Sequence, residues 1–332
     1  MTDVVPADAE FLHGRALVWD MVWPWEPWCG NDLGKLERMH SAGHNVVSIT
    51  VAGDNHTVGE AVQRVAGIKA ELAAQSQIVS LCKSVAEIDA ALAEGKLAVL
   101  LHFEGTRCFE RNLDMVSVFH ELGVGMTLLA FNQTNSVAGG CMEETDGGLT
   151  LFGRSFVAEM ARVGMLIDLS HCGHRTSLQV MEHAGAPCMF THSNAAALVQ
   201  HPRNISDAEV TACAATGGVV GISGSSMYLG DPACEPESLF RHLDHFVGLV
   251  GPDHVGLGID SVFEPDPLSA FMRARPDEWP EAREPDWQGV KMALPEDLVA
   301  LTARMLSAGY GEPAIRAILG GNWRRVCKQA WG

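Results

Sequence analysis

The chain has 332 residues, 47% of them hydrophobic, which is enough for one large α/β domain. Its 41 acidic residues outnumber 23 basic ones, for a net charge of −18, and no basic stripe is present, which argues against nucleic acid and anionic membranes as partners. The sequence has no signal-like or membrane-spanning apolar run and its nine cysteines include no CxxC pair, so we expect a cytoplasmic protein without a disulfide framework.

Short apolar runs rich in β-branched or bulky residues alternate with helix-like stretches along the chain. The predicted strands are 16–19, 46–51, 97–101, 124–130, 165–169, 188–191, 218–223 and 255–259. This alternation implies parallel pairing with right-handed crossovers, and eight such repeats close into a (β/α)8 TIM barrel. An open doubly wound sheet is the alternative, but no glycine-rich phosphate loop follows the first strand.

Between and after these strands lie helical patterns and one long insertion. The helical patterns are 58–74, 85–94, 206–217, 295–308 and 313–319. Ser206 and Glu209 have the spacing of a helix-capping box. Residues 261–290 are crowded with Pro, Glu, Asp and Arg and read as an insertion loop over the mouth of the barrel. We therefore expect a single barrel domain over residues 1–332 with this one insertion.

Two histidines stand just past the ends of two consecutive predicted strands. His171 follows strand 165–169, and His192 follows strand 188–191. In a parallel barrel the carboxyl ends of the strands converge on one mouth, so both imidazoles should lie over it. Such a pair is typical of a metal site.

Further polar residues follow other strand ends. His102 and Glu104 are two residues apart, so they should point to the same side of their strand, toward the barrel interior. Glu104 with His171 and His192 would bind zinc with one position open for water, whose pKa the metal would bring to about 7.

Two other residues suit the chemistry around such a metal. Asp260 follows the eighth strand and is the natural group to orient the water or relay its proton. Arg203, in the sequence His201-Pro202-Arg203-Asn204, offers a planar fork suited to a substrate carboxylate.

Each of these residues also has a purely structural interpretation. A single histidine near a strand end is more often a hydrogen-bonded structural residue than a ligand. A role as a buried hydrogen-bonding partner explains Asp168 as well as a catalytic role does. The tryptophan-rich stretch 19–28 could line a pocket for an apolar side chain, although packing or a subunit contact in a homodimer is the favoured role.

Seven motifs, taken in order, resemble those of the membrane dipeptidase (renal dipeptidase) family of zinc peptidases. They are Phe103-Glu104-Gly105; Gly147-Gly148-Leu149-Thr150 with Phe152-Gly153-Arg154; Gly164-Met165 through Ile167-Asp168-Leu169-Ser170-His171; Thr191-His192-Ser193-Asn194; His201-Pro202-Arg203-Asn204; Gly258-Ile259-Asp260; and Leu319-Gly320-Gly321-Asn322 with Arg325-Val326. The resemblance extends from about the first predicted strand to the C-terminus.

This resemblance implies a (β/α)8 barrel with two zinc ions bridged by a glutamate, which Glu104 matches. It also implies that His171 and His192 bind the second ion. Arg203 resembles the arginine that holds the terminal carboxylate of the dipeptide, and Asp260 resembles the aspartate near the nucleophilic water. The implied activity is hydrolysis of small peptides, namely dipeptides, often with a D-residue at the C-terminal position.

The sequence departs from the family at the first strand. Members usually carry a His-x-Asp pair there as ligands of the first metal, and this chain has none. Aligning Asp20 with the aspartate of the motif places Val18 at the histidine position. Aligning Asp20 with the acidic residue just before the motif instead places Val22 and Pro24 at the two ligand positions. Asp20 and His102 are the candidates to rebuild this first site.

Phe131 is a second departure, because several relatives have a histidine there that contacts substrate and others have a tyrosine. Three hypotheses follow: a metallodipeptidase with one firmly held zinc ion or two, a related amide hydrolase with another substrate, or a metal-binding barrel that has lost turnover. The retained Glu104, His171, His192, Arg203 and Asp260 favour an enzyme, because an inactive barrel has no physical need for a carboxylate clamp beside two imidazoles. The missing histidine of the first strand favours the third hypothesis.

Overall fold

The structure, a computed structural model, describes residues 6–25 and 32–331, and within them the strands form one parallel sheet. The strands are β1 (Trp19–Pro24), β2 (Val46–Gly53), β3 (Val79–Leu81), β4 (Leu97–Glu104), β5 (Val124–Leu128), β6 (Leu166–Asp168), β7 (Cys188–Met189), β8 (Val220–Ile222) and β9 (Val255–Leu257). Eight of them follow the order β7-β6-β5-β4-β2-β1-β9-β8. A parallel bridge between Phe190, just after β7, and Val220 of β8 joins the two ends of this order. The sheet is therefore a nearly closed barrel, which confirms the predicted (β/α)8 fold.

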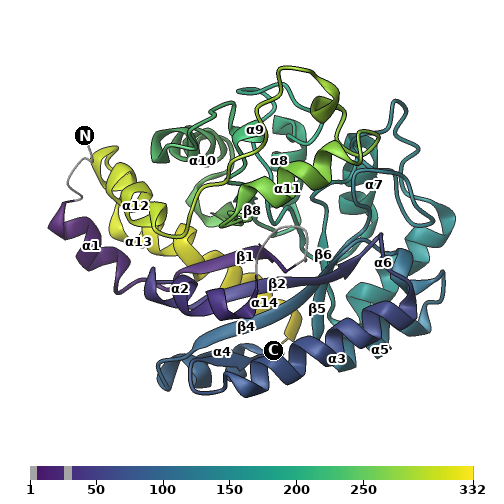
Figure 1. Ribbon diagram of the computed structural model, residues 1–332, viewed down its shortest axis with the longest axis horizontal. Coiled ribbons are helices and arrows are strands. Elements are labelled where there is room, and N and C mark those ends of the chain that lie inside the picture. The colour runs from purple at the N-terminus through teal and green to yellow at the C-terminus, as the bar shows by residue number, and fades with distance from the viewer. Residues whose placement is uncertain (1–5, 26–31, 332) are drawn as a thin grey trace.

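Helices surround these strands on the outside (Figure 1). The α-helices are α1 (Ala7–His13), α2 (Leu36–Ser41), α3 (Val58–Ala74), α4 (Val85–Ala93), α5 (Asp114–Leu122), α6 (Leu151–Val163), α7 (His174–His183), α8 (Asp207–Ala215), α9 (Ser226–Leu229), α10 (Pro236–Val250), α11 (Pro265–Arg273), α12 (Asp297–Ser307), α13 (Glu312–Arg316) and α14 (Asn322–Trp331). Short 3-10 segments occupy Leu33–Lys35, Arg107–Phe109, Pro252–His254 and Pro280–Arg283, and a π-helical segment covers Ala317–Gly321. In the part of the chain that the structure describes, no helix has the length and apolarity required to cross a membrane.

The capping box predicted from the sequence is present at the start of α8. The Ser206 hydroxyl accepts a hydrogen bond from the Glu209 backbone N–H, and the Glu209 carboxylate accepts one from the Ser206 backbone N–H. These bonds satisfy donors that a helix start otherwise leaves free, so α8 begins where the sequence indicates.

Two strands differ from the prediction. β1 begins at Trp19 rather than ending there, so Asp20 lies inside the strand and Pro24 ends it. β3 was not predicted, because three residues between two helices carry too short a pattern to show alternation. It pairs with the first half of β4, while β5 pairs with the second half.

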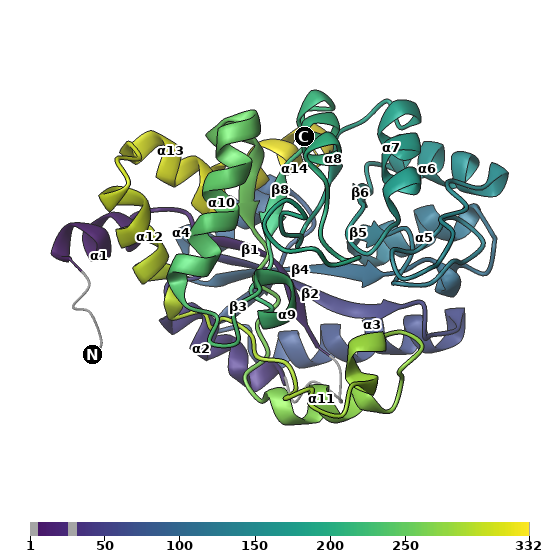
Figure 2. The ribbon, with the colours of Figure 1, turned by 90° about the horizontal axis from the view of Figure 1, so that it is seen from above.

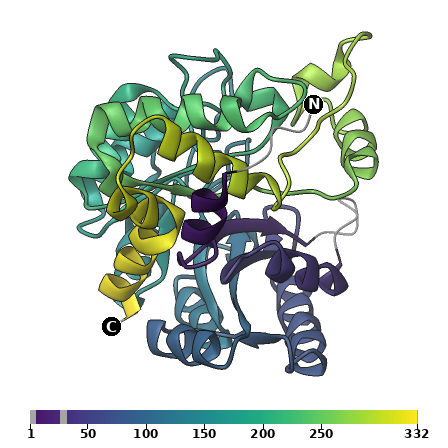
Figure 3. The same ribbon diagram turned by 90° about the vertical axis from the view of Figure 1, so that its left-hand side faces the viewer.

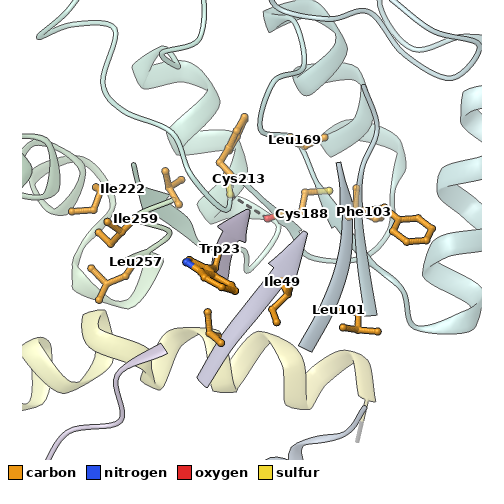
Figure 4. Packing of buried hydrophobic residues seen from close by; sticks show 14 of the residues in the cluster. Trp23, Ile49, Leu101, Phe103, Leu169, Cys188, Cys213, Ile222, Leu257 and Ile259 are labelled. Carbon is orange, nitrogen blue, oxygen red and sulfur yellow. Dashed lines mark hydrogen bonds between the residues drawn. The ribbon is translucent and has the colours of Figure 1, made fainter. Parts of the chain in front are cut away.

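The barrel is filled by large apolar side chains (Figure 4). Trp23 of β1 is fully buried and packs in the same cluster as Ile49 of β2 and Ile259, which lies two residues beyond β9. The Cys213 thiol donates a hydrogen bond of 3.1 Å to the Cys188 carbonyl oxygen, as Figure 4 shows. Burying each large side chain stabilises the fold by roughly 1.5–3 kcal/mol, which fixes the strand ends that carry the polar residues.

Residues 261–290, which we call the cap segment, are more ordered than the predicted loop. They contain helix α11 and the 3-10 segment Pro280–Arg283. Figure 2 shows the light-green cap segment along one edge of the molecule, outside the strands.

The first helix lies against helices from the last part of the chain (Figure 3). Helix α1 packs on α12, and the Nδ1 of His13 lies 2.8 Å from the hydroxyl of Thr302. Of the tryptophan-rich stretch predicted at 19–28, Trp19 and Trp23 are fully buried, which agrees with a packing role. Residues 26–28 lie outside the described part of the chain.

Candidate active site

His171 and His192 meet above the ends of two adjacent strands. His171 follows β6 and His192 follows β7, and their Nε2 atoms are 3.0 Å apart. Both side chains are buried. The backbone of His171 has a left-handed φ of 66°, a conformation that costs a non-glycine residue free energy and clusters at functional sites.

The hydrogen bond to Asn132 fixes the tautomer of His171. The Nδ1 of His171 lies 2.6 Å from the Oδ1 of Asn132, whose Nδ2 donates to the carbonyl oxygen of Glu278. Because this amide nitrogen is used as a donor, the amide oxygen must accept from His171. The ring proton therefore sits on Nδ1, and the Nε2 of His171 carries a lone pair.

The same reasoning applies to His192 through a buried hydroxyl. The Thr191 hydroxyl makes a short hydrogen bond to the Asp168 carboxylate and lies 2.8 Å from the Nδ1 of His192. Asp168 can only accept, so the hydroxyl proton points to it and the hydroxyl oxygen accepts from the imidazole. His192 therefore also carries its proton on Nδ1, with a lone pair on Nε2. Asp168 is thus a buried partner that orients the site.

Two lone pairs consequently face each other across 3.0 Å, which is unfavourable unless a positive charge lies between them. Burial, together with the charge of Arg203, lowers the pKa of both His171 and His192 well below the usual value, so an added proton is disfavoured. Two nitrogens bound to one tetrahedral zinc ion would be about 3.3 Å apart. The pair therefore fits a metal ion.

Glu104 supplies the nearest carboxylate. It ends β4, and its Oε1 lies 3.9 Å from the Nε2 of His192. Burial and the negative charge of Asp168 raise the pKa of Glu104 to about 7, against a lowering by Arg203 and Thr50. Within residues 6–25 and 32–331, no three His, Cys, Asp or Glu side chains are close enough to form a complete metal-binding group. A bound ion thus requires Glu104 to move toward the histidines.

His102 lies beside Glu104, on the predicted side of β4, but its ring nitrogens are occupied. Nδ1 is 2.9 Å from the Ser48 hydroxyl, and Nε2 is 2.9 Å from the Thr50 hydroxyl. Burial lowers the pKa of His102 to about 4, so the ring is neutral. To bind a metal, His102 would have to give up one of these hydrogen bonds.

Asp20 lies inside the barrel wall rather than at the mouth. Its Oδ1 accepts from the backbone N–H groups of Val22 and Ile259, and its Oδ2 lies 3.7 Å from the Nε2 of His44. Pro24, four residues on, lines a cavity together with Glu104. This arrangement favours the second alignment, in which Val22 and Pro24 occupy the usual ligand positions. Neither side chain has an atom that can bind a metal.

Asp260 lies three residues beyond the end of β9 and lines the same cavity as Glu104 and His171. Its backbone is left-handed, with a φ of 62°. Burial and the charge of Glu104 raise the pKa of Asp260 well above its usual value, partly opposed by Arg203. Asp260 is therefore a carboxyl group with a high affinity for a proton.

Arg203 is deeply buried. Only 2% of its surface is exposed, and its guanidinium donates to the Ser193 hydroxyl and to the backbone carbonyl of His192. The guanidinium carbon of Arg203 also lies over the ring of Tyr228, 5.5 Å from its centroid. The Nε of Arg203 has no hydrogen-bond partner among the described residues. A buried donor without a partner costs about 1–3 kcal/mol, so a ligand that accepts from it would be stabilising.

The mouth contains two neighbouring chambers that share the lining residues Glu104, Phe131 and Trp279. The inner chamber, about 60 Å³, is lined by His171 and Asp260 and by apolar side chains of the cap segment. The outer chamber, about 260 Å³, is lined by loops after β2, β4 and β5 and by the cap segment. Phe131 stacks on His171 with ring centroids 4.2 Å apart, so it walls both chambers. Residues of the cap segment therefore line both chambers.

Several residues of the site carried no clear signal in the sequence. Asn132 orients His171, and Thr191 orients His192. Asp54 accepts hydrogen bonds from two strand-end loops, including the backbone N–H groups of Thr106 and Phe131. Asn132 and Thr191 lie next to the predicted residues Phe131 and His192, which was the only available indication.

Comparison with known sequences gives a consistent result. A model of the membrane dipeptidase family (Peptidase family M19) matches residues 32–266. An uncharacterized protein in the pqqA 5′ region of Klebsiella pneumoniae is 29% identical over 280 residues, covering 81% of this chain and 95% of that protein. The dipeptidase aclJ of Aspergillus oryzae is 36% identical over 171 residues, covering 50% of this chain and 40% of that relative. The chain thus spans less than half the length of aclJ.

Solved structures are similar over nearly the whole chain. An amidohydrolase from Pseudomonas aeruginosa superimposes with a TM-score of 0.87 at 29% identity, covering 98% of this chain and 99% of that one. A metallo peptidase from Rhodobacter sphaeroides, liganded with a phosphinate mimic of the dipeptide L-Ala-D-Ala, has a TM-score of 0.77 at 23% identity, with coverages of 95% and 99%. The second likeness shows the fold alone. With the family model matching most of its length, the chain belongs to the membrane dipeptidase family, whose members are metal-dependent peptide hydrolases.

Proposed function

We propose that the protein is a zinc-dependent dipeptidase that accepts dipeptides with either an L- or a D-residue at the C-terminal position. One observation carries this proposal: the two Nε2 lone pairs of His171 and His192 converge at 3.0 Å, and His171 lines a chamber together with Asp260. Neutral imidazole nitrogens with a carboxylate are the ligands that zinc prefers in catalytic sites.

His171, His192 and Glu104 would hold one zinc ion. When bound, the ion would supply Lewis-acid chemistry, polarising the scissile carbonyl group and acidifying a water molecule. The positions of Val22 and Pro24 offer no ligand atom for a second ion. His102 and Asp20 remain the only candidates from the sequence for such a site, and both are engaged in other contacts.

Asp260 would move the proton during hydrolysis. Its raised proton affinity suits a group that takes a proton from the attacking water and passes it to the nitrogen of the leaving amine. Without this proton the nitrogen would have to leave as an anion, which is a poor leaving group. With it, the nitrogen leaves as a neutral amine. Asp260 is regenerated as a carboxylate at the end of this transfer.

Arg203 would bind the C-terminal carboxylate of the dipeptide through its remaining N–H groups, including the unpartnered Nε. The C-terminal side chain would then enter the inner chamber, where Met272 and Trp279 provide apolar walls. A volume of about 60 Å³ favours a small side chain such as that of alanine.

The proposal is tested by assaying the purified protein on L-Ala-L-Ala and L-Ala-D-Ala. We chose these because the Rhodobacter sphaeroides peptidase of the same fold binds a mimic of L-Ala-D-Ala. We expect hydrolysis that is lost after chelation and restored by zinc. Absence of hydrolysis of any free dipeptide in the zinc-loaded protein would contradict the proposal and favour a barrel without turnover.

The likeness to a protein named an amidohydrolase, at a TM-score of 0.87, supports a second candidate function, hydrolysis of a non-peptide amide. Phe131 also makes the wall of the chamber apolar where relatives carry a polar side chain. The same protein preparation should then cleave N-acyl amino acids, such as N-acetyl-alanine, faster than dipeptides.

A further inference from the structure

The outer chamber borders the inner one, and charged side chains line its walls. It shares Glu104, Phe131 and Trp279 with the inner chamber and has more than four times its volume, about 260 Å³ against 60 Å³. Arg107, from the loop after β4, and Arg275, from the cap segment, line it from two sides. Neither arginine takes part in the metal or proton chemistry proposed above.

Neither guanidinium group forms a short ion pair among the described residues. The Nη2 of Arg107 donates a long hydrogen bond of 3.5 Å to the carbonyl oxygen of Thr134. The guanidinium carbon of Arg275 lies over the ring of Phe271, 3.7 Å from its centroid, and its Nε makes a long ion pair of 4.0 Å with the Oε1 of Glu278. A stacked guanidinium keeps its N–H edges available for an anion.

The other carboxylates of the chamber are already engaged. Asp54 accepts hydrogen bonds from the backbone N–H groups of Thr106, Arg107 and Phe131 and from the amide of Asn135. Glu104 belongs to the metal-binding group. The lining thus holds two arginines and three carboxylates, those of Asp54, Glu104 and Glu278. With Asp54 committed to hydrogen bonds within the protein and Glu104 to the metal, the two guanidinium groups and Glu278 are left to bind a ligand, and they suit one that carries both an anionic and a cationic group.

The direction of the dipeptide follows from Arg203. It lies beside Tyr228, which lines the inner chamber, so a C-terminal carboxylate bound by Arg203 would direct the amino-terminal residue outward. We propose that the outer chamber binds this amino-terminal residue and selects an acidic side chain, whose carboxylate pairs with Arg107 and Arg275 while the ammonium group pairs with Glu278. This inference rests on the proposed dipeptidase function and specifies its preferred substrates.

The direct test compares kcat/KM for L-Glu-L-Ala, L-Gln-L-Ala and L-Lys-L-Ala. Glutamine has almost the same shape as glutamate without its charge, so the ratio for Glu-Ala over Gln-Ala isolates the charge. We expect a ratio of about ten or more, because a hydrogen bond to a charged carboxylate is stronger than one to a neutral amide. The kcat/KM for Lys-Ala should be the lowest of the three. A ratio near one in an enzyme that hydrolyses both would contradict the inference and leave the dipeptidase proposal intact.

Variants assign the effect to the arginines. Arg275→Gln and Arg107→Gln should each lower the Glu-Ala over Gln-Ala ratio at least threefold, and the double variant should bring it close to one. Arg283→Gln is the matched control, because Arg283 also lies on the cap segment but pairs with Asp277 and does not line the chamber. A selectivity that survives the double variant, or that falls equally in Arg283→Gln, would refute the assignment.

Binding provides a readout that does not depend on turnover. Calorimetric titration of the intact protein with L-glutamate and L-glutamine should show at least fivefold tighter binding of glutamate, lost in the double variant. If no dipeptide is hydrolysed, the proposed function fails, but this titration still decides the inference about the chamber. Equal binding of the two amino acids would contradict it.

Discussion

The two sides of the barrel mouth use their polar atoms in opposite ways. On the side of β6 and β7, Asn132 and Thr191 hold the rings of His171 and His192 so that both lone pairs converge. On the side of β1, one carboxylate oxygen of Asp20 accepts hydrogen bonds from backbone N–H groups inside the barrel wall. A metal ligand is therefore better identified by the hydrogen-bonding partner that orients its side chain than by its position at the end of a strand.

The β1 side also shows what replaces a ligand when it is absent. Pro24 lines the inner chamber and Val22 is fully buried, so apolar atoms occupy the space. His102, between the two sides, is held by two hydroxyl groups as a neutral structural residue. The donor atoms available at the mouth therefore suit one ion on the β6–β7 side.

The largest effect should come from removing a ligand on the β6–β7 side. His192→Ala should lower dipeptidase activity by about 1000-fold or more, because losing Lewis-acid stabilisation costs several kcal/mol. Bound zinc, measured by mass spectrometry after gel filtration, should fall in parallel while circular dichroism stays unchanged. His183→Ala is the control, because His183 lies on the surface of α7. A variant His192→Ala that keeps zinc and activity would remove His192 from the ligand set.

Substituting Arg203 tests whether this residue binds the carboxylate of the substrate. Arg203→Lys should raise KM for free dipeptides on the order of tenfold to 100-fold, because lysine cannot offer the planar fork. The KM for dipeptide amides should change little, since they present no carboxylate. Equal losses on both kinds of substrate would instead mean that Arg203 acts by supporting Ser193 and the His192 backbone.

Asn132 tests whether orientation matters as much as the ligands themselves. Asn132→Gly removes the hydrogen bond to His171 while tolerating the left-handed φ of 59° at this position. Affinity for zinc should fall about tenfold, the lower end of the range for partners that orient a ligand. Competition with a fluorescent chelator measures this affinity. An unchanged affinity would show that His171 needs no such partner.

Glu104 links the site to stability in the metal-free protein. Its pKa is raised from 4.5 to about 7, so the folded state holds its proton more tightly than the unfolded state does. That contribution to stability is present below pH 4.5 and is lost as the pH rises toward 7. Urea unfolding in chelator should therefore show that Glu104→Gln stabilises the protein more at pH 8 than at pH 5, by about 2 kcal/mol. Equal effects at the two pH values would contradict the raised pKa.

The sequence predicted much of this arrangement, because strand-end positions follow from topology. His171 and His192 could be placed at one mouth from two apolar runs alone, and the structure brings them together. The register of β1 could not be chosen, since both alignments of Asp20 were equally consistent with the pattern. The orientation of His171 depends on Asn132, 39 residues away, and only the folded chain brings them into contact.

The charged outer chamber was likewise invisible in the sequence. Arg107 and Arg275 belong to loops far apart in the chain and have no shared motif. The cap segment was predicted as an irregular loop, although Pro265–Arg273 forms a helix that begins with proline in its first turn. Proline at that position is compatible with a helix start, but the many charged and proline residues nearby obscured the helical pattern.

Titrating the metal-free protein with zinc while following L-Ala-D-Ala hydrolysis and bound metal tests the central claim most directly. A single ion held by the β6–β7 side predicts that activity rises linearly and reaches its plateau at one zinc ion per chain. A plateau that requires two ions, or activity that persists without any metal, would contradict it.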